Sequence, residues 1–215
     1  MKFANDIEEM VYLGFQEIDE ASYQEKIRYF ERKKPAIAQL SYQLRLEMSL
    51  EYVVALFEVG EYYQYLKHVD QLLAKVIDEN IYSIDGDDIY QELLFRKAAS
   101  LHNVLDYYGA DHILTELCKI DPDNEIYNRT FIKNNADNLR HKGQKVRGVI
   151  IALFILAGLI IGVELLIIRP FYEAQVSATE MLRNGLFLSA LGGIIFHELK
   201  IRFLSRLRRK NLLKS

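Results

Sequence analysis

The sequence contains one apolar stretch long enough to cross a lipid bilayer. Residues 148–168 read GVIIALFILAGLIIGVELLII, 21 residues of which only Glu164 is charged. A helix needs about 20 apolar residues to cross the hydrocarbon core of a bilayer. A core helix of a soluble protein normally carries a polar stripe, and this stretch has none. We therefore expect a transmembrane helix at residues 148–168.

A shorter apolar run follows in residues 185–196, which read GLFLSALGGIIF and contain 12 uncharged residues. Flanking apolar residues lengthen this run, and the long side chains of Arg183 and Lys200 can reach the two membrane surfaces. We expect a second transmembrane helix at residues 182–199, joined to the first by a short external loop at residues 169–181. A re-entrant or interfacial helix is the alternative.

The charge of the chain changes sign shortly before these apolar segments. Residues 1–139 hold 14 Lys and Arg against 26 Asp and Glu, a net charge of −12, and residues 140–215 hold 13 against 4, a net charge of +9. Basic residues crowd the linker at 140–147 and the tail at 200–215, whereas the connection from 169 to 183 is neutral. The positive-inside rule therefore predicts that both termini are cytoplasmic. We expect an integral protein of a bacterial inner membrane, because no organelle-targeting signal is visible.

The tail at residues 200–215 has the pattern of a basic amphipathic helix. Phe203 and Leu207 continue an apolar stripe, and basic side chains surround it. Such a helix lies on the cytoplasmic leaflet and binds anionic lipid headgroups. The headgroup-binding residues that we expect are Lys200, Arg202, Arg206 and Arg209.

Small residues recur four apart in both apolar segments, which lets another helix backbone approach closely. These residues are Gly158, Gly162, Gly185, Ser189 and Gly193. They predict close helix packing, either between the two apolar helices or between copies of the chain. We expect a homo-oligomer.

Glu164 is the one ionisable residue well inside an apolar segment. A carboxylate at such a position must be protonated, paired or hydrated. Arg183, at the outer end of the second segment, is the partner that we expect. The alternative is a ring of Glu164 side chains from several chains that lines a cation path.

Residues 1–139 carry apolar residues at helical spacing almost throughout, which predicts an all-α domain. No run alternates apolar and polar residues over the length of a strand. We expect Pro35 to end the second helix, because proline cannot continue the helical hydrogen bonds. The fifth helix is expected at residues 89–108 and the sixth at residues 110–120.

Two turns in this domain share one pattern, in which a glycine follows a long apolar helix and another helix begins at once. The glycines are Gly60 and Gly109. Glycine suits the left-handed position just past a helix end. The pattern predicts a repeat of helical hairpins.

Residues 91–124 resemble one tetratricopeptide repeat, and residues 42–75 resemble a more divergent copy. Ala98, Ala110 and Leu114 fall on the small and large apolar positions of that family. The departures from the family pattern are Leu94, Lys97 and Leu101. The resemblance implies a concave groove that binds a peptide or a helix of a partner protein. Tyrosine is enriched at interfaces, so the groove candidates are Tyr52, Tyr62, Tyr63 and Tyr65.

Few residues point to catalysis. Arg96 and His102 form an Arg-x5-His pattern that resembles the HEPN family of ribonucleases, in which an arginine and a histidine meet across a dimer. They are the catalytic candidates, and surface charges on a repeat helix are the alternative. Nucleic acid is not an expected partner, because a domain with a net charge of −12 repels phosphates.

No metal or cofactor is expected. The acidic loop at residues 85–88 lacks a ligand at the first position of a calcium loop, so we interpret Asp87 or Asp88 as a helix cap. His197 and Glu198 begin like a zinc-protease motif, but no second histidine follows four residues later. Cys118 is the one cysteine, and we expect a buried, unreactive thiol.

These features favour a membrane-anchored adaptor that is not an enzyme. Its helical-repeat domain is expected to recruit a protein or peptide partner on the cytoplasmic side. The alternative is an oligomeric membrane effector of the defence or toxin type, whose hairpins form a pore or disrupt the bilayer. A membrane-bound HEPN-like ribonuclease is the third hypothesis.

Overall fold

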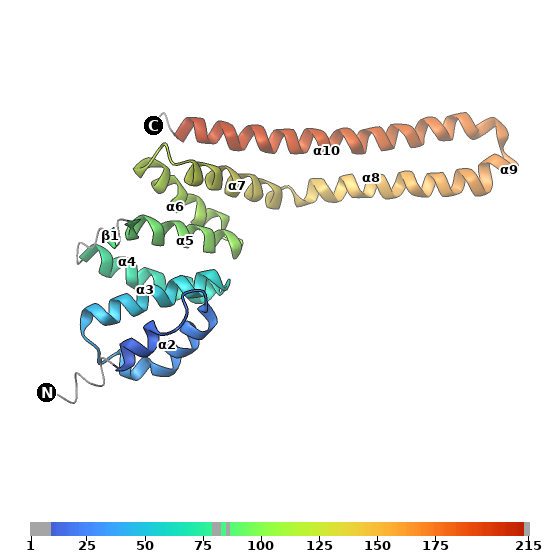
Figure 1. Ribbon diagram of the computed structural model, residues 1–215. Helices are drawn as coiled ribbons and strands as arrows, with labels where there is room; N and C mark the ends of the chain where they lie inside the picture. The colour runs from blue at the N-terminus through green and yellow to red at the C-terminus, as the bar shows by residue number, and fades with distance from the viewer. Residues whose placement is uncertain (1–9, 79–82, 85–86, 213–215) are drawn as a thin grey trace. The chain divides into compact units, whose positions relative to one another are not determined.

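The computed structural model describes residues 10–78, 83–84 and 87–212, and the chain divides into two compact units. The first unit runs to Tyr127 and the second begins at Asn128 (Figure 1). The division falls inside a helix and not at residue 139, where the charge changes sign.

Helices make up nearly all of the described part of the first unit. A helical segment at residues 10–16 is followed by α2 (Tyr23–Ile37), α3 (Tyr42–Glu58), α4 (Tyr62–Asp78), α5 (Ile89–Asn103) and α6 (Tyr107–Ile120). Each helix from α2 to α5 packs against the next one in the sequence. The all-α prediction is confirmed, with one two-residue strand pair before α5, β1 (Ser83–Ile84) and β2 (Asp87–Asp88). The successive packed pairs are compatible with a helical-repeat solenoid.

Buried apolar side chains hold the first unit together in two clusters. The larger cluster joins α2, α3, α4 and α5, and its members Val53, Leu56 and Val69 are at most 2 % exposed. The smaller cluster packs Phe15 and Met48 together and fastens the N-terminal segment to α2 and α3. The three residues on repeat positions, Ala98, Ala110 and Leu114, are fully buried. Alanine at two of them leaves room for neighbouring helices to approach closely.

The two predicted glycine turns differ in the structure. Gly60 has a φ of +82°, so its left-handed conformation after α3 is confirmed. After α5, however, Leu105 takes the left-handed position, with a φ of +67°. Gly109 lies in the first turn of α6, where a Cβ atom would stand 2.6 Å from Oδ2 of Asp106. Asp106 accepts a hydrogen bond from the Gly109 amide at 2.9 Å, so glycine serves the helix cap and α6 begins at Tyr107.

Other helix ends also refine the predictions from sequence. Pro35 lies inside α2, which continues to Ile37, so the prediction that proline ends this helix is wrong by two residues. The cap before α5 is confirmed at Asp88, whose side chain accepts a hydrogen bond from the Gln91 amide at 3.0 Å. Residues 85–86 of the acidic loop lie outside the described part of the chain.

The second unit contains most of α7 (Glu125–Lys142) and a pair of long helices. α8 (Gln144–Val163) continues through a π-helical turn, η1 (Glu164–Ile168), into α9 (Arg169–Phe171). A short 3₁₀ turn, η2 (Glu173–Gln175), leads into α10 (Val176–Leu212). α8 and α10 run antiparallel, side by side (Figure 1).

Side chains interlock along this pair. The rings of Phe154 and Phe187 meet edge to face with centroids 5.5 Å apart. Gly193 lies against Ile150, where a Cβ atom would stand 3.4 Å from the isoleucine side chain, an ordinary contact distance. Ala157 and Ala190 are buried between the helices.

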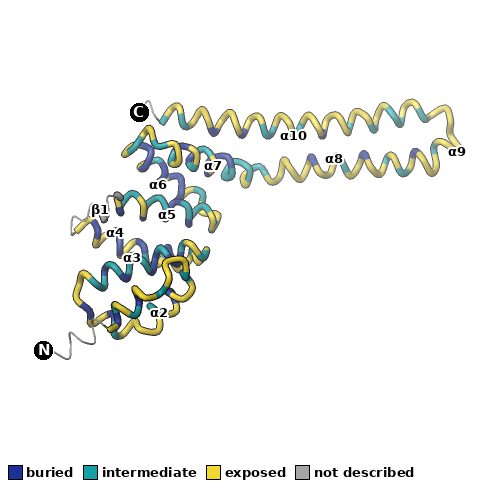
Figure 2. The backbone as a smooth tube through the Cα atoms, in the orientation of Figure 1, coloured by how far each residue is buried: buried dark blue, intermediate teal, exposed yellow. Residues whose placement is uncertain are grey.

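The segment Gln144–Phe171 is 28 residues long, and it is long and apolar enough to cross a membrane. No other helix in the described part of the chain meets this criterion, so the second transmembrane helix is not confirmed. Polar and charged residues at both ends of α10 dilute its apolar middle. Figure 2 shows that both helices nevertheless expose most of their surface.

The left-handed turns make a testable prediction about stability. Leu105→Gly should raise the unfolding temperature, because a left-handed non-glycine residue costs about 1–2 kcal/mol. Gly60→Ala should lower it for the same reason. Cys118 is 1 % exposed and is the one cysteine, so the onset of its labelling by a thiol-reactive dye on heating reports unfolding in the full chain. Equal onsets for the two variants would contradict the assignment.

Candidate functional site

A groove of about 510 Å³ runs between α2, α3 and α4 in the first unit. We call it the α2–α4 groove. Apolar and aromatic side chains line its deeper part, namely Phe30, Tyr52, Val53 and Leu72. Charged and polar side chains from α2 and α4 line its edges, namely Glu31, Lys34, Gln64, Lys67, His68, Gln71 and Lys75. Such a surface offers an apolar floor and a mainly basic rim.

Tyr52 is fixed at the floor of the α2–α4 groove by three contacts. Its ring stacks on Phe30 with centroids 4.2 Å apart and meets the edge of His68 at 5.6 Å. Its hydroxyl donates a hydrogen bond to Glu31 Oε1 at 3.4 Å. Burial and the adjacent Glu31 carboxylate raise the pKa of Tyr52 to about 12, so the hydroxyl stays a hydrogen-bond donor well above neutral pH.

The rim of the groove is more basic than the unit that carries it. Lys34, Lys67 and Lys75 are exposed, and none of them forms an ion pair with another described residue. Burial lowers the pKa of His68, and the ammonium groups of Lys34 and Lys67 lower it further against the opposing effect of Glu31. The lysines therefore supply the positive charge at neutral pH, and His68 adds none.

The four tyrosines expected in a partner groove have different surroundings. Tyr52 lines the α2–α4 groove. Tyr65 is fully buried and its hydroxyl donates to the Leu93 carbonyl at 2.9 Å, so it belongs to the core. Tyr62 is half-buried with its ring edge against Phe57, and Tyr63 is 75 % exposed. The structure thus brings one of the four to a groove.

The two catalytic candidates lie on α5 and do not form a joint site within the chain. Arg96 donates to Glu58 at 2.6 Å and to Glu92 at 2.8 Å, and its guanidinium lies over the Phe57 ring. His102 packs edge to face against Tyr107. Arg96 therefore connects α5 to α3, and catalysis would require it to leave two carboxylates.

A second polar cluster occupies the turn end of the α8–α10 pair. Glu164 is fully buried, and its two carboxylate oxygens face different arginines. Arg183 approaches Oε2 at 2.7 Å, which is the pairing expected from the sequence, and Arg169 approaches Oε1 at 3.0 Å. Arg169 also reaches Glu180 at 3.1 Å. Two carboxylates and two guanidiniums thus form a cluster with no net charge.

Sequence reasoning missed Arg169 as a partner of Glu164. A spacing of five residues turns about 140° around an α-helix, so the two side chains should point apart. The π-helical turn removes this obstacle, because the Arg169 amide bonds to the Glu164 carbonyl, five residues back. Pro170 follows directly and has no N–H to bond to Leu166 in the usual way. Pro170 was the signal in the sequence for an irregular turn.

Most of the small residues face away from the α8–α10 interface. A Cβ atom added at Gly158, Gly162 or Gly185 would meet nothing within 4 Å, and Ser189 is exposed. Gly193 alone among the five lies against the opposite helix. Packing within the pair therefore uses Gly193, and the other four leave open faces.

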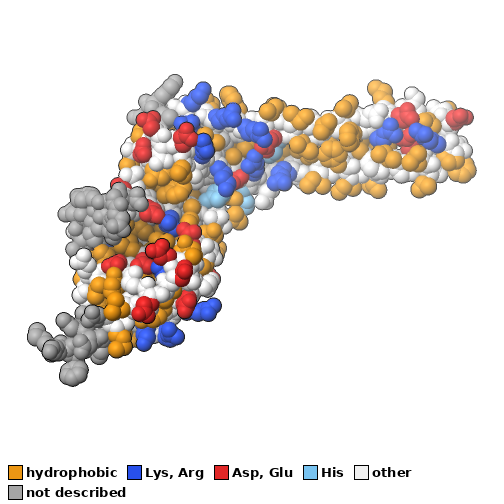
Figure 3. Space-filling model, viewed as in Figure 1, with side chains coloured by type: hydrophobic (Ala, Val, Ile, Leu, Met, Phe, Trp, Pro, Cys, Tyr) orange, Lys and Arg blue, Asp and Glu red, His pale blue; other side chains and the backbone are white. Residues whose placement is uncertain are grey.

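The basic tail continues α10 and packs on α7. Ile201 and Ser205 are buried, and Arg208 lies over the Phe131 ring and donates to Asn135. Arg209, expected to bind headgroups, donates to Asn128 at 3.0 Å instead. Lys200 and Arg206 are exposed, as is Arg202, which pairs with Glu198. Figure 3 shows apolar side chains along the middle of the pair and charged ones toward its ends.

Comparisons of the chain with protein-family models, curated proteins and solved structures find no match. The resemblance to tetratricopeptide repeats therefore depends on the residues and the packed helix pairs alone.

The Glu164 cluster predicts how the α8–α10 pair responds to loss of charge. Glu164→Gln should destabilise the full chain by about 3 kcal/mol, because it leaves partly buried guanidiniums without their main partner. Glu180→Gln is the matched control and should cost less than about 1 kcal/mol, because the Glu180 side chain is 40 % exposed whereas that of Glu164 is fully buried. Loss of helical circular dichroism during titration with sodium dodecyl sulfate measures both values. Equal midpoints for the two variants would contradict the central role of Glu164.

Proposed function

We propose that this chain is a membrane-anchored adaptor whose α2–α4 groove binds an acidic segment of a cytoplasmic protein. The observation that carries the proposal is the concentration of Lys34, Lys67 and Lys75 around an aromatic floor. The sequence of this part of the chain is otherwise strongly acidic. An acidic segment is attracted to the groove and repelled by the remaining surface, which favours binding in one place.

Anchoring in a membrane is supported by how little of the apolar helix is buried. Only 17 % of the most apolar stretch of Gln144–Phe171 is buried. A core helix of a soluble protein is covered by its neighbours, whereas Ile155, Leu159 and Leu166 are each at least 60 % exposed. Lipid is the surrounding that makes such exposure favourable.

The outward face of α10 supports a second crossing, although α10 as a whole is not apolar enough to be identified as a transmembrane helix by composition. Leu182, Leu188 and Phe196 are each more than half exposed beside the apolar part of α8. In water these side chains of α10 would be as unfavourably exposed as those of α8. Because α8 and α10 are antiparallel, a crossing by both places the basic ends on the same side, which the positive-inside rule makes cytoplasmic.

The α2–α4 groove makes a prediction about charge. The full chain should bind a labelled peptide rich in Glu and Phe, and the variant with Lys67→Glu and Lys75→Glu should bind it at least about tenfold more weakly, since two attractive charges become repulsive. Fluorescence anisotropy in detergent solution measures both affinities.

The matched control for this experiment is Lys33→Glu. Lys33 is an exposed lysine next to Lys34, but it does not line the α2–α4 groove. The affinity of Lys33→Glu for the acidic peptide should stay close to that of the unchanged chain. A Lys-rich version of the peptide, measured in parallel, shows how far the change in net charge alone alters the affinity. If Lys33→Glu weakens binding as much as the double change does, a general charge effect explains the result and the groove is not the site.

The second candidate function, an oligomeric membrane effector, is favoured by the open small-residue faces. Gly158 and Gly162 lie four apart on α8 with nothing within 4 Å of either, which suits contact with another copy. A cation path lined by Glu164 is disfavoured, because both carboxylate oxygens already contact arginines of the same chain. Self-association is thus compatible with either function.

The small-residue face predicts the state of association. Changing both Gly158 and Gly162 to Leu should shift the purified protein in detergent toward the mass of one chain, 25.1 kDa, by light scattering. Bulky side chains there prevent close backbone contact. Gly192→Leu is the control, because Gly192 is equally open and the residues four positions away, Leu188 and Phe196, are large. An unchanged mass in the double variant would exclude this face as the interface.

A further inference from the structure

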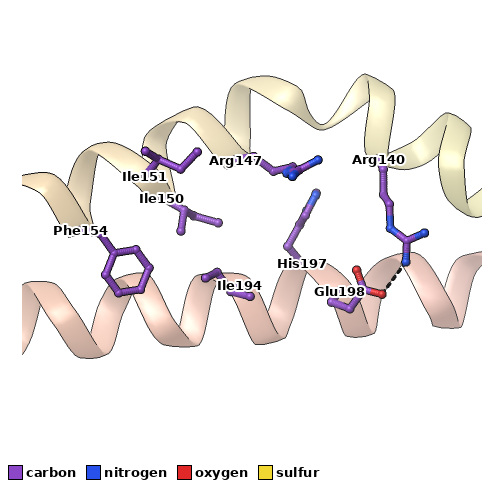
Figure 4. Close-up of a pocket in the computed structure, with 8 residues that line it drawn as sticks. All are labelled: Arg140, Arg147, Ile150, Ile151, Phe154, Ile194, His197 and Glu198. Carbon is purple, nitrogen blue, oxygen red and sulfur yellow. Dashed lines mark hydrogen bonds and ion pairs between the residues drawn. The ribbon is translucent and has the colours of Figure 1, made fainter.

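A cavity of about 380 Å³ lies where α7, α8 and α10 meet in the second unit. Figure 4 shows its side chains in two groups. Arg140, Arg147, His197 and Glu198 lie toward one end. Ile150, Ile194 and Phe154 extend toward the other. We call this cavity the α7–α10 pocket.

The polar end of the α7–α10 pocket carries one positive charge that is not paired with a carboxylate of the described residues. Arg140 is engaged by Asp137 at 2.9 Å and by Glu198 at 2.6 Å, and these contacts raise its pKa. Glu198 also accepts a hydrogen bond from Arg202 at 3.1 Å. Arg147 is exposed and pairs with no carboxylate among the described residues. An anion entering the pocket therefore meets a guanidinium that no protein group neutralises.

His197 supplies a second unsatisfied group at the same end. Its Nε2 atom is buried and has no hydrogen-bond partner in the described part of the chain. Gly143, at the junction of α7 and α8, leaves space for the His197 ring, since a Cβ atom on Gly143 would lie 2.8 Å from Nε2. A buried ring nitrogen without a partner is costly unless a ligand or water satisfies it.

The order of the two ends matches the order of groups in a phospholipid. Arg147 directly precedes the apolar run of α8, and Ile150 and Phe154 lie on its next two turns. Ile194, one turn before Glu198 on α10, completes the apolar wall. A phosphate at Arg147 would place its acyl chains along this wall. A free phosphate would leave the apolar end empty.

We propose that the α7–α10 pocket binds one anionic diacyl phospholipid, with the phosphate at Arg147 and an acyl chain along Ile150, Phe154 and Ile194. The proposal rests on the membrane anchoring proposed above. It differs from diffuse attraction of headgroups to a basic tail, because it assigns one lipid to one cavity. Basic pockets between membrane helices are suited to anionic headgroups.

The test uses native mass spectrometry of the full chain in detergent, titrated with phosphatidylglycerol or with phosphatidylcholine of the same acyl chains. One phosphatidylglycerol should be retained per chain at a concentration about tenfold lower than phosphatidylcholine. Arg147→Gln should remove this preference and Arg147→Lys should keep most of it, because loss of a charge-assisted contact is worth about tenfold in affinity. Equal retention of the two lipids by the unchanged chain would overturn the proposal.

Lys145→Gln is the matched control, with the same change in charge two residues away and outside the pocket. It should retain the lipid preference, and a loss equal to that of Arg147→Gln would overturn the assignment to a single site. Glycerol phosphate is added as a competitor. It should not displace the lipid at equal concentration, and displacement would identify a site for free phosphate instead.

Failure of this proposal can be told from failure of membrane anchoring. Membranes from cells that produce the full chain are washed with alkaline carbonate. Release of the chain by this wash would contradict the anchor and, with it, the lipid site. If the chain stays in the membrane fraction while Arg147→Gln keeps the phosphatidylglycerol preference, the anchor stands and the lipid site alone is rejected.

Discussion

Helix α8 exposes isoleucine and leucine side chains over most of its length, and this exposure constrains every other part of the second unit. Burying apolar area is worth roughly 25 cal/mol per Å². The antiparallel contact with α10 covers only one side of α8, as the burial of Ile150 and Ala157 shows. The remaining sides leave apolar side chains such as Ile155 and Leu159 exposed. The charged clusters accordingly stand near the ends of the pair and leave its middle apolar.

The cluster around Glu164 shows how a charge is tolerated next to so much apolar surface. An isolated carboxylate is expensive to bury, and hydrogen bonds to two guanidiniums offset much of that cost. Glu180 balances the second arginine, so the whole cluster carries no net charge. The π-helical turn is part of this arrangement, since it brings Arg169 within reach. Local backbone irregularity and charge compensation are therefore linked.

The sequence predicted best the features that depend on local pattern. The helices, the burial of Ala98 and Leu114 and the left-handed Gly60 follow from helical spacing and from glycine chemistry. The Glu164–Arg183 pair could also be predicted, because a buried carboxylate needs a cation and few were nearby.

Features that depend on tertiary packing could not be predicted in the same way. Leu105 adopts a left-handed conformation, although Gly109 stood four residues away as the better candidate. Tyr65 looked like an interface residue, yet it is core, since its hydroxyl finds a backbone carbonyl on another helix. Residues 140–154 and 194–198 form the α7–α10 pocket, and no spacing in the sequence predicts that these two stretches come together.

The uninterrupted course of α10 has a mechanical consequence. Its 37 residues make a rod of about 55 Å, and a bilayer core spans only about 30 Å. In the crossing proposed for α10, roughly two fifths of its length would therefore project beyond the hydrocarbon. The projecting end is the one that holds α7 through Arg208 and Arg209, and α7 is the helix in which the first unit ends. If α10 crosses in this way, a tilt of the helix within the bilayer would displace the end that holds α7.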